Sequence, residues 1–223
     1  MFRIRPMPPQ VPAALLAKAE QVEPAMIGHL RLSGIPRDCL RPIAPTKRVV
    51  GTAVTLLLPT IDAALLHHAA GLVRPGDILV IDRLGDQRFA CVGGVVALAL
   101  ARTGLTALIL DGLCTDPAEL RESGLPIWAS GTTAMTTRMH GIGGEMNYPV
   151  SIGGAVVLPG DLVIADEAGM VFLTPDEAAM RDIDLALTLQ AGEPDHLAQI
   201  RGGRPLGDLS GASALVQMKL ADS

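Results

Sequence analysis

PGDILVID, residues 75–82, and ALILDG, residues 107–112, are two short apolar runs that each contain an aspartate at or near the end. A Pro-Gly-Asp turn introduces the first run, and a helical Ala/Leu/Val stretch that begins at Gly93-Gly94 separates the two. The order strand, loop, helix, strand favours parallel pairing with a right-handed crossover. We therefore predict an α/β fold in which the loops that follow both strands open at the same edge of a sheet.

The segments around this unit continue the alternation of helices and strands. Residues 11–34 have apolar positions at helical spacing and predict a helix, or a helix pair broken at Pro24. The last twenty or so residues are rich in glycine and predict a loose tail or an arm on a neighbouring subunit. Strands are expected within 47–59, 124–129, 148–152, 155–158 and 162–165, and helices over 61–71, 117–122 and 175–200.

Composition restricts the class of protein. A chain of 223 residues can bury one substantial core, so we predict a single domain over residues 1–223 with a core at about 25–175. The formal net charge of −5, without a run of Lys or Arg, argues against direct binding of nucleic acid. Aromatic residues make up 2% of the chain, too few for a base-stacking surface.

Cysteine spacing and hydropathy bear on the compartment. Cys39, Cys91 and Cys114 stand far apart without CxxC spacing, which disfavours a disulfide framework and a thiolate zinc site. The first ten residues lack an apolar signal core, and the apolar runs are too short to span a bilayer. We expect a cytoplasmic protein without a membrane partner.

The loop after residue 111 carries two carboxylates that are candidates for chemistry. Asp116 and Glu119 are three residues apart at the start of a short helix, so their side chains can face the same way. Such a sparse set of oxygen ligands suits Mg²⁺ or Mn²⁺, with Asp116 as the metal ligand. The alternative is purely structural, since Asp116 before Pro117 is also the pattern of a helix N-cap.

The second part of the candidate site is the helix start at Gly93-Gly94. Free N–H groups from Gly93 through Val96, including Gly94 and Val95, can hold a carboxylate or phosphate, although a glycine pair can equally mark only close packing. Arg88 and Arg138 lie in polar loops where a guanidinium can neutralise an oxo acid or simply face solvent. Cys114 is a weak candidate nucleophile because no neighbouring base is evident to activate it.

In combination, these residues resemble the RraA-like family, which includes the regulator of ribonuclease activity A and metal-dependent 4-hydroxy-4-methyl-2-oxoglutarate aldolases. The likeness spans roughly residues 25–175. It rests on residues 75–82, the Gly93-Gly94 helix start, Leu110-Asp-Gly-x-x-x-Asp116-x-x-Glu119-Leu-Arg, Gly124-Leu-Pro-Ile, Gly144-Glu-Met-Asn-x-Pro-Val150 and Gly153-Gly-x-x-Val-x-Pro-Gly-Asp161-Leu-Val-x-Ala-Asp166.

The resemblance implies a swivelling β/β/α domain with a mixed sheet and flanking helices, assembled as a homotrimer or homohexamer with sites near subunit boundaries. It implies a lyase that cleaves a C–C bond in a small 4-hydroxy-2-oxo acid to release pyruvate, with oxaloacetate decarboxylation as a related reaction. Asp116, Thr115 and Glu119 then take the catalytic positions and Asp116 binds the metal. The substrate-binding positions fall on Arg88, Gly93, Gly94, Val95 and Val96.

The sequence departs from the aldolase motif at two positions. In the motif an acidic residue is followed, after a gap of twenty residues, by Arg-Asp, and after two more residues by Glu or Asp. This chain keeps Asp116 and Glu119 but has Gly94 in place of the first acid and Thr115 in place of the arginine. Three outcomes stay open: a lyase in which Arg88 or Arg138 replaces the missing arginine, an enzyme for a different small acid, and a non-catalytic protein that regulates a partner such as a ribonuclease.

Overall fold

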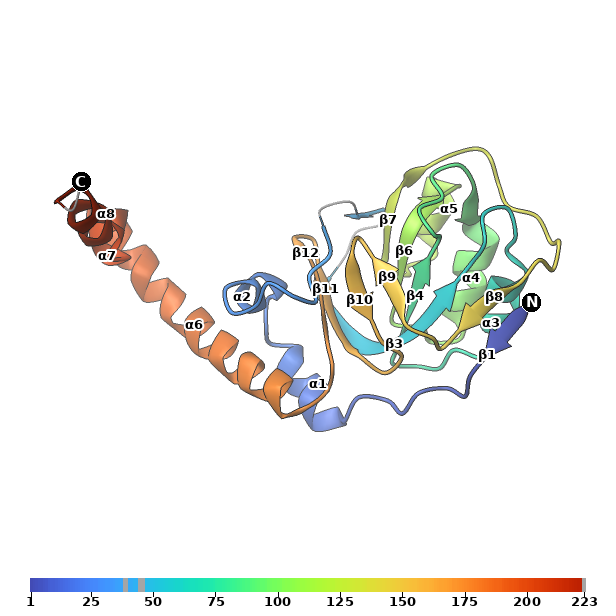
Figure 1. The fold of residues 1–223 in the computed structure, drawn as a ribbon, viewed down its shortest axis with the longest axis horizontal. Coiled ribbons are helices and arrows are strands. Elements are labelled where there is room, and N and C mark those ends of the chain that lie inside the picture. Colours follow the sequence, from blue (N-terminus) through green and yellow to red (C-terminus); the bar gives the residue numbers. More distant parts are fainter. Residues whose placement is uncertain (38–39, 44–46, 222–223) are drawn as a thin grey trace.

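A mixed sheet forms the centre of the molecule (Figure 1). The computed structural model describes residues 1–37, 40–43 and 47–221. Parallel pairing joins neighbours in the order β3, β4, β6 and β7, and Asp82 lies opposite Asp111 in the register of β4 and β6. The prediction of parallel strands is confirmed. These four strands are β3 (Val49–Leu57), β4 (Asp77–Asp82), β6 (Ala107–Cys114) and β7 (Ile127–Thr132).

Shorter strands extend the sheet on both sides and over one face. β8 and β11 each run antiparallel to one end of β3, β1 runs parallel to β8, and β2 closes the other edge on β7. β5 pairs with the end of β6, β12 pairs with β11, and β9 and β10 form a separate hairpin. Their bounds are β1 (Phe2–Ile4), β2 (Arg41–Pro42), β5 (Ala90–Val92), β8 (Gly144–Met146), β9 (Val150–Ile152), β10 (Ala155–Val157), β11 (Leu162–Asp166) and β12 (Gly169–Leu173).

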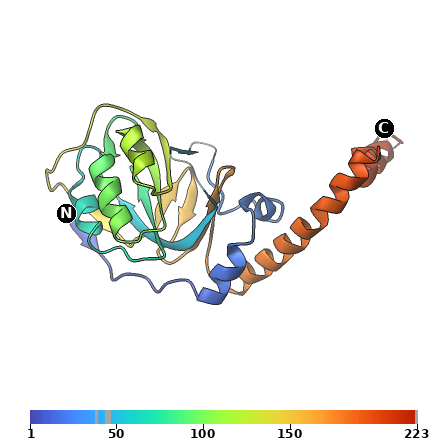
Figure 2. The ribbon, with the colours of Figure 1, turned by 180° about the vertical axis from the view of Figure 1, so that it is seen from behind.

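The alternation of side chains along β4 separates two cores. Leu79 and Ile81 pack with the helices on one face of the sheet, whereas Ile78 and Val80 pack with the β9–β10 hairpin on the other. Both faces of β4 are therefore buried, which explains its continuous apolar sequence. Figure 2 shows the helical layer, made of α3 (Ala64–Ala69), α4 (Gly94–Arg102) and α5 (Pro117–Glu122). The predicted β/β/α arrangement is confirmed.

A third core lies under the terminal helices. α1 (Ala13–Ala19) and α2 (Pro24–Gly28) are the predicted helix pair, and they pack with the start of α6 (Glu177–Arg201) against β11 and β12. Asp176 caps α6 by accepting a hydrogen bond from the Ala179 N–H at 2.9 Å. After α6 the chain continues in α7 (Leu206–Leu209) and α8 (Ala212–Ala221), where we had expected a loose tail or an arm on a neighbouring subunit.

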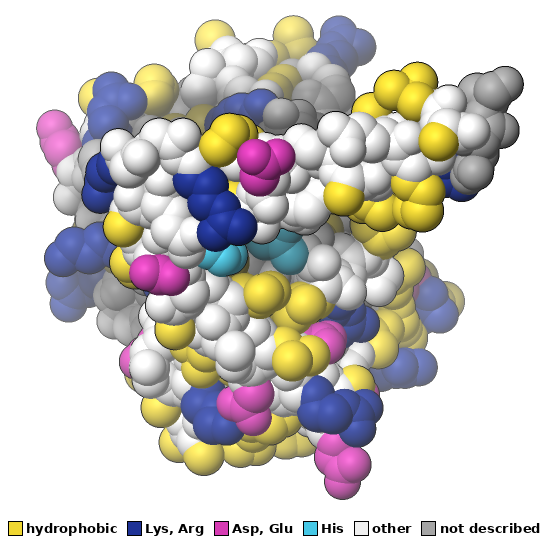
Figure 3. All heavy atoms as spheres, turned by 90° about the vertical axis from the view of Figure 1, so that its left-hand side faces the viewer, with side chains coloured by type: hydrophobic (Ala, Val, Ile, Leu, Met, Phe, Trp, Pro, Cys, Tyr) yellow, Lys and Arg dark blue, Asp and Glu magenta, His cyan; other side chains and the backbone are white. Residues whose placement is uncertain are grey.

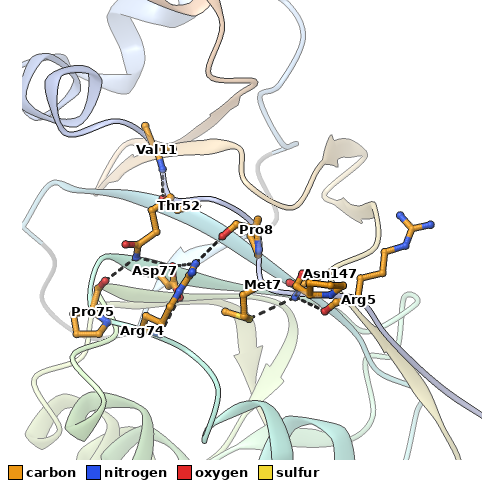
Figure 4. A network of polar contacts seen from close by, with 11 residues as sticks. Arg5, Met7, Pro8, Val11, Thr52, Arg74, Pro75, Asp77 and Asn147 are labelled. Carbon is orange, nitrogen blue, oxygen red and sulfur yellow. Dashed lines mark hydrogen bonds and ion pairs between the residues drawn. The ribbon is translucent and has the colours of Figure 1, made fainter.

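The N-terminal segment is tied along the body by polar contacts (Figure 4). The Thr52 hydroxyl accepts a hydrogen bond from the Val11 N–H at 2.9 Å, and the Asn147 amide donates to the carbonyl of Arg5 at 3.1 Å. Buried Asp77 accepts from the Arg74 guanidinium at 3.0 Å, and that guanidinium also donates to the Pro8 carbonyl. These contacts bring β1 beside β8, a pairing between segments 142 residues apart that no local pattern indicates.

The remaining differences from the sequence-based predictions concern the lengths of elements. β6 continues through Cys114, two residues beyond the expected end at Gly112. Since β5 pairs with this added length, Thr115 and Asp116 directly follow a strand and are not part of a long loop. None of the helices in the described part of the chain is long and apolar enough to cross a membrane.

Candidate functional site

The loops that follow β4 and β6 meet beside the end of β5. Thr115 donates its N–H to the Val92 carbonyl at 2.9 Å, and this bond joins the residue after β6 to the last residue of β5. Gly93 and the start of α4 follow Val92, so the two predicted halves of the site come together here. The candidate residues that follow β5 and β6 therefore lie side by side, and their chemical role stays a prediction.

Glycine is required at both positions of the Gly93-Gly94 pair by close approach. A Cβ on Gly93 would lie 2.5 Å from the Asp116 carboxylate, and a Cβ on Gly94 would lie 2.6 Å from the Cβ of Glu119. No side chain fits at such distances unless the α5 segment moves. The close-packing interpretation of the glycine pair therefore holds: Gly93 packs against the Asp116 carboxylate, and Gly94 packs against the aliphatic part of the Glu119 side chain.

The Asp116 carboxylate does not cap its own helix. Its backbone is left-handed, with φ of 52°, and its side chain makes no capping hydrogen bond to α5. One carboxylate oxygen instead accepts from the Gly94 N–H at 3.1 Å, and the other accepts from the Thr115 hydroxyl at 3.0 Å. A non-glycine residue in this conformation is uncommon, although aspartate tolerates it better than most. The structure therefore argues against the N-cap alternative. The Asp116 carboxylate points towards α4.

An open groove of about 630 Å³ runs between α4 and α5 in front of this carboxylate. Three lining residues, Leu98, Glu122 and Ser123, were missed by the sequence analysis. Leu98 and Glu122 lie three residues after Val95 and Glu119, so helical spacing from the predicted residues was the available signal. The groove is lined by Gly94, Val95, Leu98, Asp116, Glu119, Glu122 and Ser123.

Two backbone donors remain free at the start of α4. The Gly94 N–H is used by Asp116, and the Ala97 N–H donates to the Gly93 carbonyl at 3.0 Å. The N–H groups of Val95 and Val96 have no acceptor among the residues that the structure describes. Val95 lines the groove with 83% of its surface exposed, whereas the Val96 side chain packs against the core. These two amides are the unused donors at this helix start, and the residue of one of them, Val95, lines the groove.

The two loop arginines lie outside the groove of a single chain. Arg88 is exposed, and its guanidinium lies 5.3 Å from the centre of the Phe89 ring. Arg138 is exposed on the loop between β7 and β8, where its guanidinium donates to the Thr136 carbonyl at 2.8 Å. Neither lines the groove, so a role for Arg88 in substrate binding stays a prediction.

The cysteine beside the site is unsuited to nucleophilic chemistry. Burial raises the pKa of the Cys114 thiol to about 11, and the thiol donates to the Gly131 carbonyl at 3.3 Å. At neutral pH the thiol therefore stays protonated, while the thiolate is the reactive form. Cys91 is also buried with its pKa raised to about 11, and Cys39 lies outside the described residues.

The donor set at the groove fits one kind of metal ion. Its side-chain ligands are the carboxylates of Asp116, Glu119 and Glu122, which suit hard cations. In residues 1–37, 40–43 and 47–221 no three His, Cys, Asp or Glu side chains are close enough to hold an ion together. The residues therefore do not fit a fully protein-ligated metal such as structural zinc, but they fit Mg²⁺ or Mn²⁺ held by one carboxylate and several waters.

A glycine pair packed on an Asp-x-x-Glu helix start, within a β/β/α domain, defines the class to which this protein belongs. Residues 24–172 match the RraA-like family, described as Aldolase/RraA. The chain is a member of the RraA-like family.

Individual relatives divide between two descriptions. A Halalkalibacterium halodurans protein provisionally named 4-hydroxy-4-methyl-2-oxoglutarate aldolase is 33% identical over 135 residues, which are 60% of this chain and 63% of that protein. The chain thus spans less than two thirds of that relative. Streptomyces coelicolor RraAS2, of the RNase ES inhibitor family RraA, is 26% identical with a TM-score of 0.72, covering 85% of this chain and 98% of its own. The RNA-processing inhibitor RraA from Thermus thermophilus is 26% identical with a TM-score of 0.63, covering 68% and 92%.

The close approach at Gly93 generates a testable prediction. Gly93→Ala should lower the free energy of unfolding by about 1–3 kcal/mol, because the added methyl group displaces the Asp116 carboxylate. Urea titration followed by circular dichroism measures the change. Gly192→Ala is the matched control, since Gly192 lies in α6 with nothing within 4 Å of an added Cβ and alanine favours a helix. Equal stability of Gly93→Ala and the wild-type protein would mean that the two loops are not in contact.

Proposed function

We propose that the protein is a lyase that uses Mg²⁺ or Mn²⁺ to cleave a C–C bond in a small 4-hydroxy-2-oxo acid and release pyruvate, with oxaloacetate decarboxylation as a related reaction. The observation that carries the proposal is the orientation of Asp116. Its carboxylate is not used as a helix cap and stands in the groove beside the free N–H groups of α4. The family membership and the aldolase name of the relative from Halalkalibacterium halodurans support the same reaction class.

The groove provides separate places for the substrate's carboxylate and for the cation. The N–H groups of Val95 and Val96 would bind and orient the carboxylate next to the oxo group, aided by the positive end of the helix dipole. Asp116 would hold the cation, directly or through its waters. A bound divalent ion supplies positive charge next to the oxo group, where negative charge develops as the bond breaks.

Glu119 is the proposed proton acceptor of the chain. The substrate's 4-hydroxyl loses its proton and its oxygen forms a double bond to C4, while the bond between C3 and C4 breaks and its electrons move to C3 to give the enolate of pyruvate. Return of the proton to C3 converts the enolate into pyruvate and leaves C4 as the carbonyl carbon of the second product. Glu119 lines the groove one helical turn after Asp116, so its carboxylate can receive that proton. Exposed Leu98 and Val95 supply an apolar wall at the mouth of the groove.

Thr115 is the main difference from the aldolase motif. Its hydroxyl donates to Asp116 and can orient that carboxylate, but it carries no charge to meet the substrate. A charge-assisted hydrogen bond contributes about 1.5–3 kcal/mol, so its loss lowers activity by roughly ten- to a hundredfold unless another cation replaces it. Arg88 or Arg138 of a neighbouring subunit could do so only in an oligomer, and a homotrimer or homohexamer is part of the proposal.

A regulatory role is the second candidate. The structural likeness to RraAS2 extends over 85% of this chain, and that protein is described as a member of an RNase inhibitor family. The absence of the motif arginine at Thr115 also fits a chain that has given up catalysis. This alternative expects binding to a ribonuclease partner that does not depend on a divalent ion.

The enzymatic proposal predicts activity that depends on a metal ion and on Asp116. Pyruvate should be released from 4-hydroxy-4-methyl-2-oxoglutarate or from oxaloacetate with Mg²⁺ or Mn²⁺, and excess EDTA should abolish the release. Asp116→Asn should lower the rate at least a hundredfold, because the amide keeps the shape of the side chain but not its charge. A coupled assay for pyruvate measures both effects.

Asp184→Asn is the control, since it removes an exposed carboxylate on α6 that pairs with Lys18 far from the groove. Its rate should equal that of the wild-type protein. Release that continues in excess EDTA would contradict the metal mechanism. A complete lack of release from both substrates would favour another small acid or the regulatory role.

Substitution at Thr115 tests the departure from the motif. Thr115→Arg should raise the rate of pyruvate release by about ten- to a hundredfold, because it restores a cation next to Asp116. Thr115→Val, which keeps the shape but loses the hydroxyl, should not raise the rate. Steady-state kinetics of pyruvate release by the folded variants measure both effects. An unchanged rate in Thr115→Arg would show that residue 115 does not face the substrate.

A further inference from the structure

The groove between α4 and α5 extends beyond the positions proposed for the cation and for the substrate's first carboxylate. The two helices lie side by side (Figure 2), and one helical turn past Val95 and Glu119 the groove is lined by Leu98, Glu122 and Ser123. We refer to these three residues as the outer groove. A substrate whose carboxylate lies at the start of α4 places its far end there, because Leu98 is about 4.5 Å beyond Val95 along the helix.

The outer groove combines an apolar wall with a carboxylate that has no cationic partner. Leu98 is 56% exposed and forms the wall. Glu122 forms no ion pair with any residue that the structure describes. The Ser123 hydroxyl donates to the Leu120 carbonyl at 2.7 Å and accepts from the Leu125 N–H at 3.2 Å, so its hydrogen is already used. The side chains of the outer groove therefore offer a ligand an acceptor and an apolar surface, but no cation.

This lack of cations is local to the groove. The chain contains 18 Lys and Arg residues, and their side chains are spread over the face of the molecule that carries α6 (Figure 3). On α4 the basic residue is Arg102, about 10.5 Å beyond Val95 along the helix, and it does not line the groove. A five-carbon acid spans only about 5 Å, since each C–C bond is about 1.5 Å long. Arg121 on α5 points about 100° away from Glu122 and does not line the groove either.

Charge in the groove selects against a second carboxylate on the substrate. The side chains of Asp116, Glu119 and Glu122 line the groove as three carboxylates. A bound divalent cation offsets two of these charges, and the substrate carboxylate next to the oxo group restores one, so the occupied groove stays negative. Like charges a few ångströms apart repel each other even where solvent screens them. A carboxylate at the far end of the substrate would face Glu122 without a cation to offset it.

We propose that the groove takes 4-hydroxy-2-oxo acids with a single carboxylate, in which C4 carries a short neutral chain, and that Glu122 sets this specificity. The carbons of the chain pack on Leu98, and a hydroxyl on it can donate to Glu122. Cleavage of the C3–C4 bond then gives pyruvate and a neutral aldehyde or ketone. The inference rests on the proposed function and narrows it, because the 4-hydroxy-4-methyl-2-oxoglutarate in the name of the Halalkalibacterium halodurans relative carries a second carboxylate.

Binding of two unreactive analogues tests the charge argument without catalysis. 2-Oxopentanoate and 2-oxoglutarate have chains of equal length and differ only at C5, which is a methyl group in the first and a carboxylate in the second. Neither has a 4-hydroxyl, so neither is cleaved. Isothermal titration calorimetry of the full chain with Mn²⁺ should give a Kd at least about tenfold lower for 2-oxopentanoate. Equal affinities, tighter binding of 2-oxoglutarate, or no binding of either compound would overturn the proposal.

Substitution of Glu122 tests which residue is responsible. The Kd of 2-oxoglutarate should fall about threefold in Glu122→Gln and about tenfold or more in Glu122→Lys, while the Kd of 2-oxopentanoate should change less than about twofold. Glu167→Gln is the matched control, because Glu167 is exposed in the turn between β11 and β12, outside the groove. It should leave both constants unchanged. An unchanged Kd of 2-oxoglutarate in Glu122→Lys would contradict the role of Glu122.

Release of pyruvate separates this inference from the proposed function. 4-Hydroxy-2-oxopentanoate should be cleaved to pyruvate and acetaldehyde with a kcat/KM at least about tenfold above that for 4-hydroxy-2-oxoglutarate, which again differs only at C5. Faster cleavage of 4-hydroxy-2-oxoglutarate would refute the single-carboxylate specificity and leave the lyase standing. Preferential binding of 2-oxopentanoate without release of pyruvate from either substrate would support the ligand class and refute the lyase.

Discussion

The contact between the Gly93-Gly94 pair and the Asp116–Glu119 segment is the constraint on which the site depends. A Cβ atom on Gly93 would lie 2.5 Å from the Asp116 carboxylate, and one on Gly94 would lie 2.6 Å from the Cβ of Glu119. Only glycine, which has no Cβ, allows the two segments to approach so closely. This approach lets the Gly94 N–H hold one oxygen of the Asp116 carboxylate. It also explains why that carboxylate turns away from its own helix and towards the groove. Backbone geometry thus sets the direction of the one side chain that the proposed chemistry needs most.

The sheet supplies the framework for this contact. β4 and β6 are buried on both faces, so their ends are fixed by two cores, and the loops that follow them begin from rigid positions. The extension of β6 to Cys114 and its pairing with β5 carry that rigidity up to Thr115. Such support from regular elements suits the proposed site, in which a small acid and a cation would lie within a few ångströms of each other.

Much of this could be predicted from the sequence because its signals are local. Apolar runs, the Pro-Gly-Asp turn and the Asp-Pro helix start predict the strands and helices, and the order of these elements predicts parallel pairing. The orientation of Asp116 could not be predicted, since Asp before Pro equally indicates a cap, and a contact across 22 residues decides between the two interpretations. The pairing of β1 with β8 depends in the same way on a tertiary contact, whereas Leu98 and Glu122 could have been found from helical spacing. The helix over 175–200 was predicted, but α7 and α8 were not, because the glycines and the proline between residues 202 and 211 predict a tail without regular structure.

The most direct test of the account is a crystal structure of the protein grown with Mn²⁺ and pyruvate, with the metal located by anomalous scattering. The account predicts a manganese peak in the groove beside Asp116, bound to its carboxylate directly or through one water, with the pyruvate carboxylate near the N–H groups of Val95 and Val96. A peak at another place in the molecule, or a groove without metal under saturating Mn²⁺, would contradict it.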